Sequence, residues 1–81
     1  MAGTEELIRA AELVRAGDWE GAHRIVQARE DRTAHWLHAL LHKIEGDETN
    51  SRYWYGRAGR VYEEFDDPAA ELAAIREALS G

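Results

Sequence analysis

Two Gly-Asp pairs divide this chain into segments of helical length, and they constrain its fold more than any other feature. Gly17-Asp18 and Gly46-Asp47 lie 29 residues apart. Glycine often ends a helix in the left-handed conformation, and aspartate is a preferred N-cap of the helix that follows. A connection this short forces the two helices that it joins to lie antiparallel. The sequence therefore predicts αα-hairpins.

Helical signals run through almost the whole chain, whereas the sustained alternation of apolar and polar residues that indicates strands is missing. Asp67-Pro68 is a strong start for the last helix, because proline fits the first helical position. The pattern predicts five helices: from Thr4 as the cap to about Ala16, from Asp18 to about Glu30, from Asp31 or Thr33 to about Glu45, from Asp47 to about Phe65, and from Asp67 to the end of the chain.

These segments predict an all-α fold in one domain that spans residues 1–81, with two helical hairpins plus a C-terminal helix stacked in a tetratricopeptide-like manner. The spacing of 29 residues is shorter than the roughly 34 residues of a tetratricopeptide unit. Apolar residues from Trp36 to Ile44 cover about 140° of the third helix, which is wider than a surface helix requires. We therefore expect the third helix to be enclosed by its neighbours on two sides.

The composition argues against several classes of protein. The net charge is −6 and cysteine is absent, so we expect no nucleic-acid partner, no disulfide and no cysteine-ligated metal. No apolar run approaches the roughly 20 residues that span a bilayer, and the N-terminus lacks the pattern of a signal peptide. We expect a cytoplasmic protein with no membrane partner. Nothing in the sequence requires catalysis, and we assign no catalytic residues.

Three of the four histidines, His35, His38 and His42, fall within eight residues of the third predicted helix, and Glu45 follows. At about 100° per residue, the last two of these histidines and Glu45 lie within roughly 60° of one another. Two imidazoles one turn apart can bind one ion, and together with a carboxylate they suit zinc or non-haem iron. His23 on the second helix is a further candidate ligand. The alternative is structural, with buried imidazoles that hydrogen-bond to neighbouring helices.

The fourth predicted helix carries a group of aromatic and arginine residues outside its apolar stripe. Tyr53 projects away from that stripe together with Arg57 and Arg60, and Gly56 also lies well away from it. Tyrosine and arginine on an exposed face are typical of residues that dominate protein interfaces. The sequence therefore predicts a partner-binding face formed by Tyr53, Gly56, Arg57 and Arg60.

Three glycines, Gly21, Gly56 and Gly59, fall inside predicted helices. Each interior glycine destabilises a helix by about 0.5–1 kcal/mol relative to alanine. The favoured explanation is close packing, by the approach of a neighbouring helix or by making room for a large ring, and the alternative is a shallow groove for a ligand. Gly56, which lies away from the apolar stripe, is expected on a surface that another molecule contacts.

A distinctive motif runs from Asp18 to Arg60. It consists of a Trp-x-x-x-His segment, then W-x-H-x3-H-x2-E-G-D, then N-x2-Y-W-Y-x-R-x-G. The motif is carried by Trp19, His23, Trp36, His38, His42, Lys43, Glu45, Asp47, Asn50, Tyr53, Trp54, Tyr55, Arg57 and Gly59. It resembles a small family of uncharacterised bacterial and fungal proteins, and the resemblance implies a helical, tetratricopeptide-like protein of unassigned role. One departure is Gly56, where that family carries a long basic or polar side chain, as expected if a natural scaffold had an engineered surface.

Two functional hypotheses follow from these features. The favoured one is a non-enzymatic interaction module, which binds another protein through the aromatic and arginine face and needs no cofactor. The alternative is a zinc- or iron-binding protein with His38, His42 and Glu45 as ligands and with His35 and His23 near.

Overall fold

The computed structural model describes residues 2–81, which form five α-helices and one short 3₁₀ helix. The elements are α1 (Ala2–Arg15), α2 (Trp19–Gln27), α3 (Arg32–Glu45), α4 (Glu48–Ala58), η1 (Tyr62–Glu64) and α5 (Pro68–Ser80). The predicted all-α class is confirmed, and no strand occurs in the described residues.

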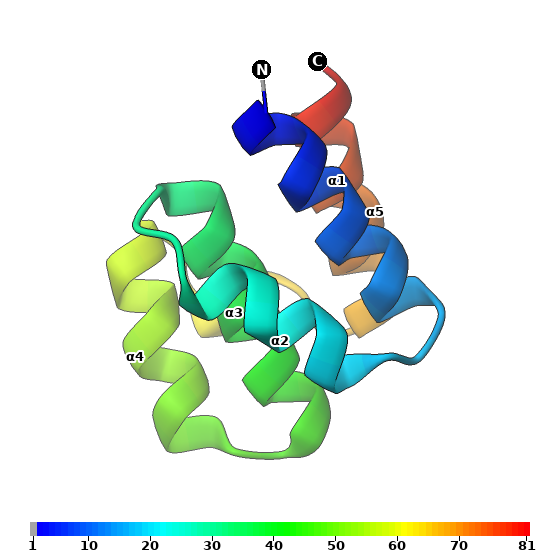
Figure 1. Ribbon diagram of the computed structural model, residues 1–81. Coiled ribbons are helices and arrows are strands. Elements are labelled where there is room, and N and C mark those ends of the chain that lie inside the picture. The colour runs from blue at the N-terminus through cyan, green and yellow to red at the C-terminus, as the bar shows by residue number, and fades with distance from the viewer. Residues whose placement is uncertain (1) are drawn as a thin grey trace.

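Both Gly-Asp pairs form the turns that the sequence predicts. Gly17 and Gly46 have positive φ values of 87° and 86°, which glycine adopts without strain. The side chains of Asp18 and Asp47 accept hydrogen bonds from the first turns of α2 and α4. As a result, α1 pairs with α2 and α3 pairs with α4 as two antiparallel hairpins (Figure 1).

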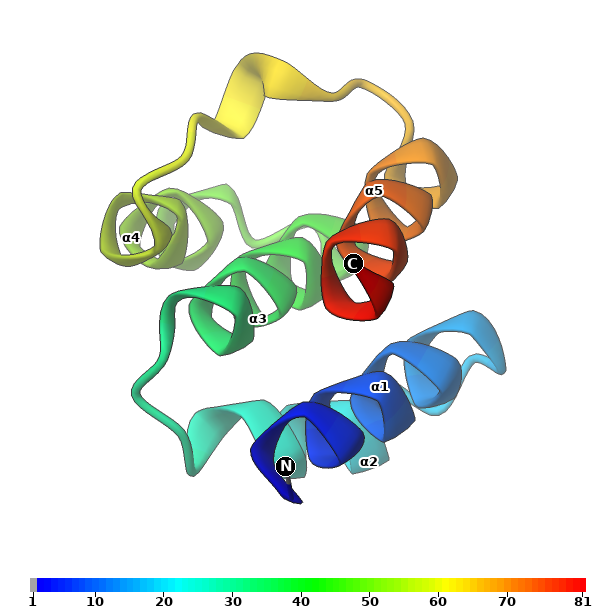
Figure 2. The same ribbon diagram turned by 90° about the horizontal axis from the view of Figure 1, so that it is seen from above.

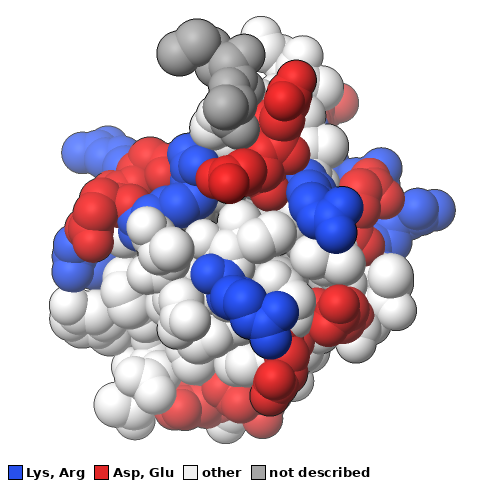
Figure 3. Space-filling view, in the orientation of Figure 1, with Lys and Arg blue, Asp and Glu red and all other residues white. Residues whose placement is uncertain are grey.

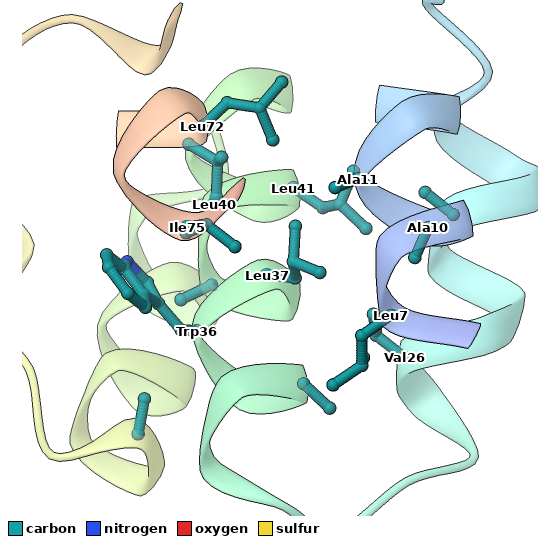
Figure 4. Packing of buried hydrophobic residues seen from close by; sticks show 14 of the residues in the cluster. Leu7, Ala10, Ala11, Val26, Trp36, Leu37, Leu40, Leu41, Leu72 and Ile75 are labelled. Carbon is teal, nitrogen blue, oxygen red and sulfur yellow. The ribbon is translucent and has the colours of Figure 1, made fainter. Parts of the chain in front are cut away.

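Helix α3 lies in the middle of the molecule and contacts all four other helices. In the view of Figure 2, α4 lies on one side of α3 and α5 on the other, and the hairpin of α1 and α2 lies below α3 in the picture. Leu37, Leu40 and Leu41 of α3 are inaccessible to solvent and pack between residues of α1 and α5 (Figure 4). The expectation of an enclosed third helix is confirmed, except that Ile44 at its end is 46% exposed.

Helix α5 returns to the start of the chain. It packs against α1 and α3, and it lies side by side with α1 in the opposite direction (Figure 1). The first residues of α1 and the last of α5 therefore lie at the same end of the molecule.

The prediction that the fourth helix reaches Phe65 is wrong, because α4 ends at Ala58. Gly59 has a φ of 72°, and the backbone N–H of Arg60 donates to the carbonyl of Tyr55 at 2.9 Å. This geometry closes the helix and leaves Val61 60% exposed. The apolar residues after Gly59 continue a helical spacing, but they belong to η1 and its flanking turns.

Two other predicted boundaries shift by a few residues. Helix α1 begins at Ala2 rather than after Thr4, and α2 ends at Gln27 rather than near Glu30. Asp31 is the N-cap of α3, but its carboxylate makes no capping hydrogen bond because it accepts from the Arg29 guanidinium at 2.9 Å.

Close helix packing does not explain the interior glycines. A Cβ at Gly56 would meet nothing within 4 Å, and Gly59 is the residue that ends α4. At Gly21 a Cβ would lie 2.5 Å from Oδ2 of Asp18, the carboxylate that caps α2. The prediction is therefore wrong for Gly59, Gly21 makes room for a cap, and Gly56 lies on open surface, in keeping with its expected position away from the apolar stripe.

A buried carboxylate connects three helices. Glu71 of α5 is 1% exposed and accepts hydrogen bonds from Trp36 Nε1 and Lys43 Nζ of α3, each at 2.9 Å, and from the Tyr55 hydroxyl of α4. Burial and the hydrogen bond to Glu71 raise the pKa of Tyr55. This network fixes α4 and α5 on opposite flanks of the central helix.

Across residues 2–81, no helix combines the length and the apolar character needed to cross a membrane.

Candidate metal centre

His38 and His42 lie one turn apart on α3, and both are buried, with exposures of 3% and 8%. Their rings stack with centroids 5.0 Å apart. Nδ1 of His42 lies 2.6 Å from Oε1 of Glu45 on the next turn. The carboxylate therefore holds one nitrogen of this ring and leaves Nε2 free.

His23 of α2 completes a cluster of three imidazoles. Its Nε2 lies 3.1 Å from Nε2 of His38, and its ring centroid lies 5.5 Å from that of His42. Each of the three side chains offers a nitrogen, and these nitrogens all lie within 4.8 Å of one another. The cluster thus combines one helical turn of α3 with a residue from the neighbouring hairpin.

The arrangement differs from the predicted set in two residues. Glu45 contacts a nitrogen of His42 and forms, with His42 and Asp47, a second group of possible ligands that does not include His23 or His38. His35 is buried on α3, but its ring lies 5.2 Å from that of Trp54 and its Nε2 lies 4.0 Å from a Glu30 oxygen. His23, the most distant of the candidates in sequence, lies together with His38 and His42, in the place expected for Glu45 or His35.

Two tryptophans form the walls of the cluster. Trp19 stacks on His23, with centroids 4.7 Å apart and an interplanar angle of 12°. Trp54 of α4 stacks on His38 at 4.0 Å and 14°. Nε1 of Trp19 donates to the Leu41 carbonyl at 2.7 Å, which fixes the indole against α3. Trp19 is not among the site residues predicted from the sequence, although its spacing of four residues from His23 predicts that the two rings are neighbours on α2.

Burial favours the neutral form of two imidazoles, His23 and His38. Burial lowers the pKa of His38 to about 3, and the neighbouring charges of His23, His42 and His35 add to this effect. Burial, followed by the proximity of His42, also lowers the pKa of His23. Neutral rings carry the lone pairs that bind metal ions. Nδ1 of His38 is buried and has no hydrogen-bond partner among the described residues.

The surface over α4 carries little charge, whereas the rest of the same face is charged. In the space-filling view, charged side chains lie along the upper part, the right side and the lower edge, and one basic side chain lies near the middle (Figure 3). The imidazoles of the cluster come from α2 and α3, the indoles that stack on them come from α2 and α4, and the carboxylates of Glu45 and Asp47 lie beside His42.

The predicted partner-binding residues separate into two groups. Tyr53 is 54% exposed, and its hydroxyl accepts a hydrogen bond from Arg57 at 2.9 Å. Gly56 has open space around it. Arg60 instead lies over the ring of Trp36, 3.4 Å from the centroid, and pairs with Glu64. Its side chain therefore belongs to a different part of the surface from Tyr53 and Arg57.

Comparison with known proteins identifies no relative: no family model, no curated protein and no solved structure matches the chain. The resemblance of residues 18–60 to a family of helical proteins stays a prediction, and a function has to be inferred from the chain's own residues.

Proposed function

We propose that this protein binds a divalent transition-metal ion through His23, His38 and His42. The observation that carries the proposal is the separation of 3.1 Å between Nε2 of His23 and Nε2 of His38. Two nitrogens that bind one tetrahedral zinc ion at their usual bond lengths lie about 3.3 Å apart. The two side chains therefore need only a small adjustment to share an ion.

The carboxylate of Glu45 provides independent support. A metal-bound histidine usually donates its other ring N–H to a carboxylate, a carbonyl or water, which fixes the ring and increases its basicity. Glu45 holds this position on Nδ1 of His42, at 2.6 Å. In this proposal Glu45 orients the ligand His42, whereas the sequence predicts that Glu45 is itself a ligand.

The donor set selects the kind of ion. Imidazole nitrogens suit zinc, iron, cobalt, nickel and copper, whereas magnesium and calcium prefer oxygen ligands. We propose zinc or ferrous iron as the natural occupant, and cobalt(II) serves as a spectroscopic substitute.

The chain provides a matched control for the test. Untagged protein would be stripped with a chelator and titrated with zinc or cobalt(II) by calorimetry. We expect one ion per chain and a loss of affinity of at least about 100-fold in His23→Gln and His38→Gln, because each removes one of only three ligands. His35→Gln changes another buried imidazole of α3 outside the cluster, and it should bind as tightly as the parent.

Circular dichroism of each variant separates a lost ligand from a lost fold. The proposal would be overturned by folded protein that binds less than half an ion per chain, or by equal affinity losses in His35→Gln and His38→Gln.

A second function is favoured by the surface of α4. Tyr53 is more than half exposed, Arg57 donates a hydrogen bond to its hydroxyl, and a Cβ at Gly56 would meet no atom within 4 Å. Interfaces are enriched in tyrosine and arginine. We propose that this face contacts another protein, as in the interaction module that the sequence predicts.

Capture of a partner from a lysate by immobilised protein tests this second function. Tyr53→Ala and Arg57→Ala should each abolish capture, whereas Arg60→Ala should retain it because Arg60 lies against Trp36. Capture that survives the first two substitutions, or that is lost equally in all three, would remove this face as the contact.

A further inference from the structure

We infer that an ion held by the three imidazoles keeps at least one coordination position open to a small anion from solvent. The inference rests on the proposed metal binding and deepens it, because it names the class of ligand that completes the site.

The number of donors requires an outside ligand. Within residues 2–81, the group around the candidate ion consists of His23, His38 and His42. Zinc and cobalt take at least four ligands. The nearby carboxylates are already engaged, since Glu45 holds Nδ1 of His42 and Asp47 accepts hydrogen bonds from Asn50 at the start of α4. A fourth ligand therefore comes from solvent.

The burial of the three rings indicates the route of access. His38 and His42 are almost fully buried on α3, whereas His23 is only partly buried. Trp19 and Trp54 are partly exposed and stack on the faces of His23 and His38. The indoles cover ring faces, whereas a ring nitrogen binds an ion in the plane of its ring. Because His23 is the most exposed of the three ligands, the ion would lie closest to solvent on the side of His23.

The charge balance selects an anion over a neutral ligand. Three neutral imidazoles leave the full charge of a divalent ion uncompensated, and a bound cation is often the largest local charge in a site. Two carboxylates, Glu45 and Asp47, lie beside the ligand His42, but neither belongs to the group of three imidazoles, so the ligands themselves leave the charge of the ion unbalanced. A small monodentate anion at the open position would bind directly to this charge.

The test uses the whole protein loaded with one equivalent of cobalt(II), whose visible absorption reports its ligands. Sodium azide is the probe, and sodium perchlorate at the same ionic strength is the non-coordinating control. We expect the spectrum to change with azide until one anion is bound per cobalt and to stay unchanged with perchlorate. His35→Gln, which keeps the three ligands, should give the same azide titration.

The possible outcomes distinguish failure of the open coordination position from failure of metal binding. If cobalt binds at one equivalent and azide leaves the spectrum unchanged, the open position is refuted and metal binding stands. If cobalt does not bind to the folded chain, both the proposed function and this inference are overturned. Loss of cobalt from the protein during the titration, detected after gel filtration, would show that azide competes for the metal and would also refute the inference.

Discussion

Nζ of Lys43 lies 2.9 Å from Oε1 of Glu71, and the two side chains are only 9% and 1% exposed. The same ammonium donates to the carbonyls of Tyr62 and Phe65 at 2.9 and 3.1 Å. One lysine on α3 therefore holds both the segment that follows α4 and the first turns of α5. Buried charges of this kind are tolerated when they are paired and hydrogen-bonded, as these are.

Removal of Lys43 should destabilise the fold strongly. Lys43→Met leaves the carboxylate of Glu71 buried without its cation, and breaking a buried pair in this way lowers the free energy of unfolding by about 3–5 kcal/mol. Urea denaturation followed by circular dichroism measures the change. Arg76→Met, which removes an exposed pair with Glu12, is the control and should lower the free energy of unfolding by less than about 1 kcal/mol. Similar losses in the two variants would show that burial does not set the strength of the Lys43 pair.

Two glycines should respond in opposite directions to alanine. Gly56 lies inside α4 with open space around it, so Gly56→Ala should stabilise the protein by about 0.5–1 kcal/mol. Gly46 has a φ of 86°, where a side chain is strained, so Gly46→Ala should destabilise it by about 1 kcal/mol. Thermal unfolding of both variants beside the parent checks the signs. A destabilising Gly56→Ala would mean that another group contacts this surface.

Acid should destabilise the metal-free protein. The pKa of His38 is lowered from 6.5 to about 3, so between these values the unfolded chain binds more protons than the folded one. The contribution of His38 is complete above its unfolded pKa and is lost as the pH falls toward 3, and from pH 7 to pH 5 the loss is about 2 kcal/mol. His23 acts in the same direction, because its pKa is also lowered.

Chemical denaturation at several pH values in the presence of a chelator measures this slope. His38→Gln should make the dependence shallower, because the titrating ring is gone. A free energy of unfolding that is constant between pH 7 and pH 5 would contradict the burial of neutral imidazoles.

The role of Glu45 can be separated from that of a ligand. If its carboxylate orients His42, Glu45→Gln should weaken metal binding by about 10–100-fold without changing the stoichiometry. Glu48→Gln alters an exposed carboxylate at the start of α4, and it should leave the affinity unchanged. Competition between the protein and a chelator of known affinity gives the ratio. Unchanged affinity in Glu45→Gln would remove it from the centre.

Local signals were sufficient to predict most of the helices. Glycine followed by aspartate acts within one turn, so Gly17-Asp18 and Gly46-Asp47 specify the two hairpin turns through local geometry alone. The end of α4 was misplaced because the apolar spacing continues beyond Gly59. What stops the helix there is the left-handed Gly59, and Lys43 of α3 binds the carbonyls of Tyr62 and Phe65 in the segment that follows; a periodicity pattern includes neither.

The candidate centre could be predicted in part. The spacing of His38 and His42 places both rings on one side of α3, as the sequence indicates. The third imidazole depends on how α2 crosses α3, which no local pattern specifies, and so His23 could be named as a candidate but not placed. Glu45 was assigned as a ligand because its helical angle allows it, whereas its actual partner is the near nitrogen of His42.

The side-by-side placement of α1 and α5 makes this fold a natural candidate for circular permutation. A short linker between the end of α5 and the start of α1, with the chain opened between α2 and α3, would keep every pair of packed helices. His38 and His42 would then lie near the new N-terminus and His23 near the new C-terminus. In that permuted chain, binding of an ion would show that the residues near the new N-terminus and those near the new C-terminus lie together in the folded protein.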